Sequence, residues 1–127
     1  MAEVGIYDHV DFRVRDVRKL KRFYDALMPA LGFPVIRAGE RTRDYHHKDR
    51  RLPFFGLVQA VTSAPGRSRI AFAALTRKDV DRVAKVIRRA GGKEIYGPEV
   101  CTSYHQPYYA VFFEDPDGNK FEVCCRR

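Results

Sequence analysis

The sequence lacks the features that indicate a secreted, membrane-bound or zinc-cluster protein. It contains no tryptophan, and only three of its 127 residues are cysteine. No pair of cysteines has the CxxC spacing typical of zinc and redox sites. No apolar run approaches the roughly 20 residues that a membrane span needs, and the first residues lack the basic and apolar regions of a secretion signal. We therefore expect a cytoplasmic protein with reduced thiols and no membrane partner.

Positive charge is what the sequence has in excess. The net charge is +8, from 24 Lys and Arg against 16 Asp and Glu. In stretches 18–22 and 77–89 the basic residues alternate with apolar residues at helical spacing, as they do on solvated helix faces. No helix-turn-helix, zinc-finger or aromatic RNA-binding signature accompanies them, so we expect no nucleic-acid partner. A small anionic substrate would use the same electrostatic field.

The chain repeats one pattern after a shift of 60 residues. HVDFRV, which begins at His9, aligns with RIAFAA, which begins at Arg69. Each copy opens with an alternating strand and continues as a helix with apolar residues three and four apart, for which Asp16 and Thr76 are the expected N-caps. The expected strands after the helices are 34–38, 43–47 and 54–62 in the first copy, and 93–96, 108–114 and 120–126 in the second.

These two copies predict the fold. Each has the order strand, helix, strand, strand, strand, and neither is long enough to bury a sufficient core by itself. We therefore expect one α+β domain over residues 1–127, made of two βαβββ modules at about 6–62 and 69–126.

Glu122 is the residue that most needs an explanation. It lies in the last expected strand between two apolar residues, where an ionised carboxylate costs several kcal/mol unless a cation, a metal or a hydrogen-bond donor meets it. His9 and Arg69 occupy equivalent positions on the polar faces of the two opening strands. Aligning LVQAV with KFEVC makes Gln59 the equivalent of Glu122. We expect these four polar residues to converge.

The sequence resembles the vicinal oxygen chelate superfamily, which includes glyoxalases, extradiol dioxygenases, and bleomycin- and fosfomycin-resistance proteins. The resemblance rests on HVDFRVRDVRKLKRFYDALMPALGF, on RIAF and on FFEDPDGNKFEV. It implies paired βαβββ modules that form a curled mixed sheet around a cavity, with the helices on the outer face, usually within a homodimer. It also implies a divalent metal (Zn, Ni, Mn or Fe(II)) held by residues from the first and last strands of the modules.

Carried onto this chain, the resemblance implies His9, Gln59 and Glu122 as metal ligands, with Glu122 also acting in proton transfer. Arg69 departs from the family pattern, in which histidine is common, because a guanidinium has no lone pair for a metal. Two functions remain open. The first is a metal-dependent lyase, isomerase or dioxygenase that acts on a small oxygen-bearing substrate. The second is a metal-free relative that binds or sequesters a small molecule such as an antibiotic, with Arg69 paired to Glu122.

Further side chains are candidates for the cavity wall or for a replacement ligand. Arg69, Tyr109, His105 and Phe55 are the expected ligand-binding residues, and each has an ordinary alternative as a surface or packing residue. The remaining candidates are the aromatic residues Tyr104 and Tyr108 and the neighbouring histidines His46 and His47. Only one of those two histidines can face inward, because successive side chains on a strand point to opposite faces.

Exchange of Arg69 for histidine tests whether the arginine has replaced a metal ligand. If it has, Arg69→His should create or strengthen binding of Zn²⁺ or Ni²⁺, because imidazole supplies the missing lone pair. Metal content after dialysis and isothermal titration measure the change. An unchanged metal affinity would place Arg69 away from any metal site.

Overall fold

The structure is a computed structural model that describes residues 4–103 and 106–127. The first module consists of β1 (His9–Val14), α1 (Val17–Ala30), β2 (Val35–Ala38), β3 (Thr42–His46) and β4 (Phe54–Gln59). The second consists of β5 (Arg69–Ala73), α2 (Arg77–Ala90), β6 (Lys93–Val100), β7 (Tyr109–Glu114) and β8 (Lys120–Cys125). The α+β class and the βαβββ order of both modules are confirmed. The clearest difference is β6, which continues to Val100 where we predicted an end at Tyr96.

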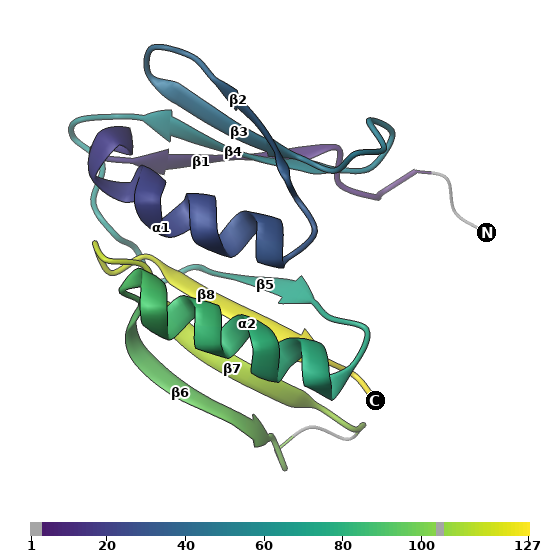
Figure 1. Cartoon of the computed structure of the whole chain (residues 1–127). Coiled ribbons are helices and arrows are strands. Elements are labelled where there is room, and N and C mark those ends of the chain that lie inside the picture. The colour runs from purple at the N-terminus through teal and green to yellow at the C-terminus, as the bar shows by residue number, and fades with distance from the viewer. Residues whose placement is uncertain (1–3, 104–105) are drawn as a thin grey trace.

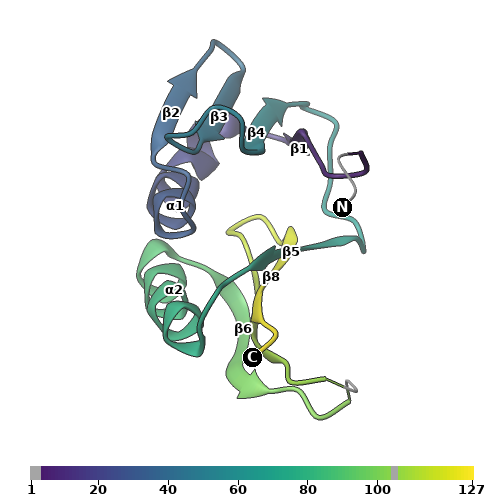
Figure 2. The same cartoon turned by 90° about the vertical axis from the view of Figure 1, so that its right-hand side faces the viewer.

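The strands form two sheets of four, in the orders β1-β4-β3-β2 and β5-β8-β7-β6. The first strand of each module runs parallel to the last, and the other neighbours are antiparallel. Each helix covers one face of its own sheet, and the two helices lie side by side (Figures 1 and 2). The opposite face of each sheet carries no helix, and His9 and Glu122 lie on these open faces.

Both helices begin at the predicted caps. The Asp16 Oδ1 atom accepts hydrogen bonds from the backbone N–H groups of Arg18 and Lys19, at 2.9 and 3.4 Å. The Thr76 hydroxyl oxygen accepts one from the N–H of Asp79 at 3.1 Å. These bonds satisfy N–H groups that have no partner within the helix. Within the described residues, neither helix is long and apolar enough to cross a membrane.

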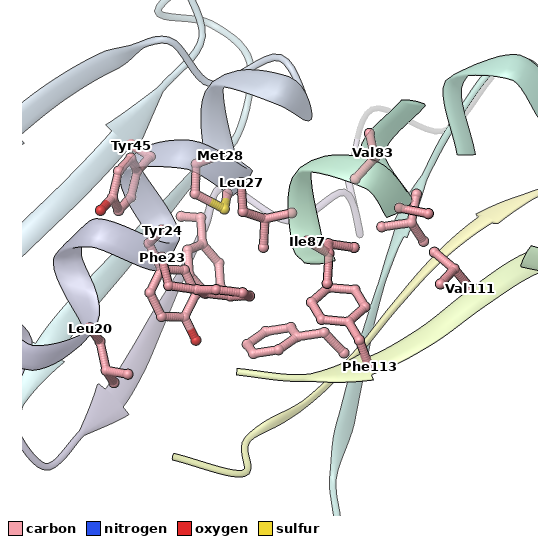
Figure 3. Packing of buried hydrophobic residues seen from close by; sticks show 14 of the residues in the cluster. Leu20, Phe23, Tyr24, Leu27, Met28, Tyr45, Val83, Ile87, Val111 and Phe113 are labelled. Atoms are coloured by element: carbon pink, nitrogen blue, oxygen red, sulfur yellow. The ribbon is translucent and has the colours of Figure 1, made fainter. Parts of the chain in front are cut away.

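One hydrophobic core is shared by the two modules. The ring centroid of Phe12 on β1 lies 5.2 Å from that of Phe121 on β8, and Phe55 on β4 lies 5.6 Å from Phe72 on β5. Figure 3 shows the helix side of this core, where side chains of α1 and α2 meet around Ile87. Each large apolar side chain contributes about 1.5–3 kcal/mol when fully buried. Separating the modules would expose this surface, so they fold as one unit.

A buried carboxylate joins the modules at the turn between β7 and β8. Asp115 is fully buried, and its Oδ2 atom accepts a hydrogen bond of 2.6 Å from the Tyr24 hydroxyl on α1. It also accepts bonds from the backbone N–H groups of Asp117 and Asn119, both at 2.9 Å, and from Asn119 Nδ2 at 2.7 Å. Burial, together with the charge of Asp115, raises the pKa of the Tyr24 phenol, which therefore stays protonated and donates. Four donors meet the cost of burying this charge.

Tyr24→Phe removes one of these donors without changing the shape of the core. We expect the free energy of unfolding to fall by about 1.5–3 kcal/mol, the range for hydrogen bonds to charged groups. Urea denaturation measures the change. Tyr7→Phe is the matched control, because Tyr7 is 79% exposed. Equal stabilities of the two variants would contradict a role for Asp115 in holding the modules together.

Candidate functional site

Glu122 lies on the face of the second sheet that carries no helix. It is 5% exposed and is paired with Ala71 on β5 and with Phe112 on β7. Its chain neighbours Phe121 and Val123 point into the shared core, because successive residues of a strand face opposite sides. A buried carboxylate at this position agrees with the sequence pattern, and it requires a partner within the structure.

The partner of Glu122 is Tyr108. The Tyr108 hydroxyl donates a short hydrogen bond to Oε2 of Glu122, and the tyrosine is itself 5% exposed. Burial, together with the neighbouring Cys124 and Glu122, raises the pKa of the Tyr108 phenol. Tyr108 therefore remains protonated near neutral pH. A hydrogen bond to a charged acceptor is stronger than one between neutral groups, so this bond offsets part of the cost of burying Glu122.

Arg69 makes different contacts from the expected pair with Glu122. Its Nη1 atom donates a hydrogen bond of 2.8 Å to the backbone oxygen of Phe121. Its guanidinium carbon lies 5.2 Å from the centroid of the Phe112 ring, a cation–π distance. No ion pair joins Arg69 to Glu122 in the described part of the chain. The guanidinium therefore lies at the edge of the Glu122 face as a positive charge that has no acidic partner among the described residues.

Gln59 has a structural role on the opposite side of its sheet. Its Oε1 atom accepts a hydrogen bond of 3.0 Å from the backbone N–H of Val17, the first residue of α1. Its strand partner is Val14, which points into the core, so Gln59 lies on the side of the helix. The oxygen expected to bind a metal is therefore already used to cap α1.

The structural repeat explains why Gln59 and Glu122 differ. Gly56 pairs with Asp11 on β1, and Glu122 pairs with Ala71 on β5. Since Asp11 and Ala71 are equivalent after the shift of 60, the counterpart of Glu122 is Gly56. Gln59 lies three residues further along the strand, and an odd shift moves a side chain to the other face of a sheet.

His9 lies on the corresponding open face of the first sheet. Its ring stacks on Phe54 with centroids 4.6 Å apart. Its Nδ1 atom lies 2.7 Å from an oxygen of Asp8, and Nε2 lies 3.5 Å from an oxygen of Asp11. The hydrogen bond to Asp8 is the main cause of a raised pKa at His9. The contact with Asp8 therefore shifts the titration of His9 toward the imidazolium form, and only the neutral ring has a lone pair for a metal.

The neighbouring histidines His46 and His47 lie on opposite faces, as the strand pattern predicts. His46 stacks on Phe54 with centroids 4.4 Å apart and is 7% exposed. Burial lowers the pKa of His46, which favours its neutral form. His47 packs against Phe33, with centroids 4.2 Å apart. Neither histidine lies on the sheet that carries Glu122.

Two expected wall residues point into the core side of the molecule. Phe55 is 2% exposed and packs in the shared core. The Tyr109 hydroxyl donates a hydrogen bond of 2.6 Å to Asp81 on α2. The alternation of β7 therefore directs Tyr108, and not Tyr109, toward Glu122. Two further candidates lie outside the described residues, Tyr104 and His105.

The donors that the structure describes in one chain do not fit a divalent metal. Across residues 4–103 and 106–127, no group of three or more His, Cys, Asp or Glu side chains is placed to hold a metal ion. His9 and Glu122 belong to different sheets. The Gln59 oxygen caps α1, and Arg69 cannot ligate. We therefore assign no reaction step to a metal.

Two βαβββ modules around one core, with a buried carboxylate on the last strand, define a vicinal oxygen chelate fold. Residues 6–123 match the Glyoxalase/Bleomycin resistance protein/Dioxygenase superfamily, and the chain belongs to this superfamily. Comparison with curated protein sequences gave no match.

Solved structures share this fold over nearly the whole chain. A glyoxalase/bleomycin resistance protein from Albidiferax ferrireducens is 26% identical, with a TM-score of 0.81 over 94% of this chain and 98% of that one. A family enzyme from Burkholderia phytofirmans is 17% identical, with a TM-score of 0.70 over 94% and 98%. The fosfomycin resistance protein FosX from Mesorhizobium loti is 21% identical, with a TM-score of 0.66 over 98% and 93%. The last two likenesses concern the fold alone.

His9 and His46, which both stack on Phe54, should have pKa values on opposite sides of the ordinary histidine value of 6.5. We expect the midpoint of His9 to lie above this value, because Asp8 stabilises the imidazolium, and that of His46 below it. Side-chain NMR titration measures both. Asp8→Asn should lower the pKa of His9 and leave His46 unchanged. A His9 midpoint that does not respond to this change would contradict the Asp8 contact.

Proposed function

We propose that the chain binds a small anionic, hydroxyl-bearing molecule without a metal, on the Glu122 face of the second sheet. The observation that carries this proposal is the buried hydrogen bond from Tyr108 to Glu122. It supplies the carboxylate with a neutral partner, so that no metal is needed to stabilise the charge. A homodimer in the cytoplasm is part of the same proposal, on the pattern of the family.

Access to Glu122 comes from the edge strand β5. Ala71 and Ala73 point to the same side as Glu122, and both are exposed. Because their side chains are short, we expect a ligand to approach the carboxylate from this side. A ligand hydroxyl can donate to Glu122 from this side, because a carboxylate has capacity for several hydrogen bonds.

Arg69 supplies the preference for an anion. It lies on the same strand, two residues before Ala71, and its charge has no acidic partner within the described residues. A guanidinium binds carboxylate or phosphonate oxygens through paired N–H groups. Together with Glu122, it favours a ligand that carries both an anionic group and a hydroxyl, as an α-hydroxy acid does. The net charge of +8 favours the approach of such an anion.

A metal-dependent lyase, isomerase or dioxygenase is the second candidate, and the surroundings of His9 favour it. Its Nδ1 atom is bonded to the carboxylate of Asp8. Carboxylate–histidine pairs of this kind orient metal ligands in proteins. Because His9 and Glu122 lie on different sheets of one chain, this function requires a second copy to bring an imidazole to Glu122.

Ligand binding by chelator-treated protein separates the two candidates. We expect lactate and related α-hydroxy acids, followed by NMR titration, to bind without metal. Arg69→Ala and Glu122→Gln should each weaken binding about tenfold, which corresponds to about 1.4 kcal/mol. Arg67→Ala is the matched control, because it removes the same charge from the exposed linker two residues away.

Two results would overturn metal-free binding. One is the absence of hydroxy-acid binding by the folded protein. The other is binding that appears only after addition of Zn²⁺, Ni²⁺, Mn²⁺ or Fe²⁺, at about one metal per chain. The second result would support the metal-dependent enzyme.

A further inference from the structure

A pocket of about 390 Å³ lies at the junction of the two modules, apart from the Glu122 face. Its wall is formed by the start of α1, by the linker after β4 and by the turn between β7 and β8. Its volume falls within the range of small-molecule sites. None of the residues that line it belongs to the Glu122 site proposed above. Gln59, which we expected beside Glu122 from the sequence, lines this pocket instead.

The pocket is held by contacts between the two modules. The Asp115–Tyr24 hydrogen bond ties the β7–β8 turn to α1. In the same turn, Gly118 has a φ of +98° and lies close to the linker, since a Cβ atom there would be 3.7 Å from Cγ of Pro65. The walls therefore come from segments that are distant in sequence and fixed by buried bonds.

Gln59 presents hydrogen-bond donors to this pocket. Its Oε1 atom accepts from the N–H of Val17, and this bond determines which end of the amide is the oxygen. The Nε2 group is therefore the free end of the side chain. It donates to no described residue in the structure, and Gln59 lines the pocket.

Asn119 presents an acceptor to the same pocket. The residue is only 8% exposed, and its Nδ2 group donates to Asp115 at 2.7 Å, which fixes the orientation of the amide. Its Oδ1 atom accepts no hydrogen bond from the described residues. Every described side-chain oxygen that is sealed from solvent has a hydrogen-bond partner. The Oδ1 atom is therefore open to solvent, and the space that Asn119 lines is this pocket.

Charges of both signs surround these two amides. The α1 side carries Arg15, Asp16 and Lys19, and the turn carries Asp117. Arg15 donates to the backbone oxygen of Ser63 and Asp16 caps α1, whereas Lys19 makes no ion pair with a described residue. A simple anion would meet Lys19 and the Gln59 donors, but it would leave the Asn119 oxygen without a donor and would be repelled by Asp117. A ligand with both charges satisfies all four groups.

We propose that this pocket is a second ligand site, which binds a small zwitterion of the α-amino acid type. The carboxylate of the ligand accepts hydrogen bonds from Gln59 Nε2 and from Lys19. Its ammonium group donates to Asn119 Oδ1 and to Asp117. The site is independent of Glu122, so it goes beyond the proposed function of the second sheet.

Binding of free amino acids to the full chain tests this site. The probes are glycine, L-alanine, L-serine and L-glutamate, measured by NMR titration or calorimetry. We expect saturable binding of at least one of them at one site per chain. N-acetylglycine, which lacks the ammonium group, and glycinamide, which lacks the carboxylate, should bind at least tenfold more weakly than glycine or not detectably.

Gln59→Glu is the decisive variant. It keeps an oxygen for the Val17 N–H and the shape of the side chain, but it replaces the donor with a negative charge. Amino-acid affinity should fall at least tenfold, with the circular dichroism spectrum unchanged. Lys19→Ala should also weaken binding, whereas Lys21→Ala, an exposed lysine of the same helix outside the pocket, should not.

Three results would overturn the proposal. They are the absence of saturable binding of every probe, unchanged affinity in folded Gln59→Glu protein, and loss of amino-acid binding in Glu122→Gln instead. Hydroxy-acid binding on the Glu122 face is measured separately. Failure of one proposal can therefore be told apart from failure of the other.

Discussion

The burial of Asp115 is the interaction on which the arrangement of the two modules depends. Its carboxylate belongs to the last hairpin of the second module, while the Tyr24 hydroxyl that meets it belongs to the first helix. An unsatisfied charge at this depth would be strongly destabilising, so the turn and α1 are held together. The same contact places Asn119 beside the start of α1, which creates the junction pocket. The aromatic core between the sheets supplies most of the buried apolar surface. The bond of Asp115 to Tyr24 fixes the position of one module against the other.

The alternation of strand side chains decides which residues can take part in a site. Tyr108 and Tyr109 are neighbours in sequence, yet one hydroxyl meets Glu122 and the other meets Asp81 on α2. Phe55 points into the core for the same reason. A shift of one or three residues in a repeat alignment therefore exchanges a functional position for a packing position. Gln59 is the clearest case, because the true counterpart of Glu122 is Gly56, and Gln59 lies three residues further on, at the other face of the sheet.

The polar residues expected to converge on one site each have partners nearby in the chain. Glu122 accepts a hydrogen bond from Tyr108, Arg69 donates to a backbone oxygen, and His9 is bonded to Asp8. Membership of the superfamily defines the fold but not the reaction, because function depends on the particular side chains on the open faces. On the proposal made above, those side chains recognise a small polar molecule without a metal.

The sequence by itself determined the fold class, the two modules, the helix caps and the burial of Glu122. These depend on local periodicity, on short-range hydrogen bonds and on a repeat that covers most of the chain. Only the tertiary structure decided the partners of the polar residues. The Tyr108–Glu122 bond joins two strands, the contact of Gln59 with Val17 depends on strand register, and the junction pocket requires segments from both modules. Such contacts depend on side-chain direction across long sequence separations, which the pattern of a single chain does not encode.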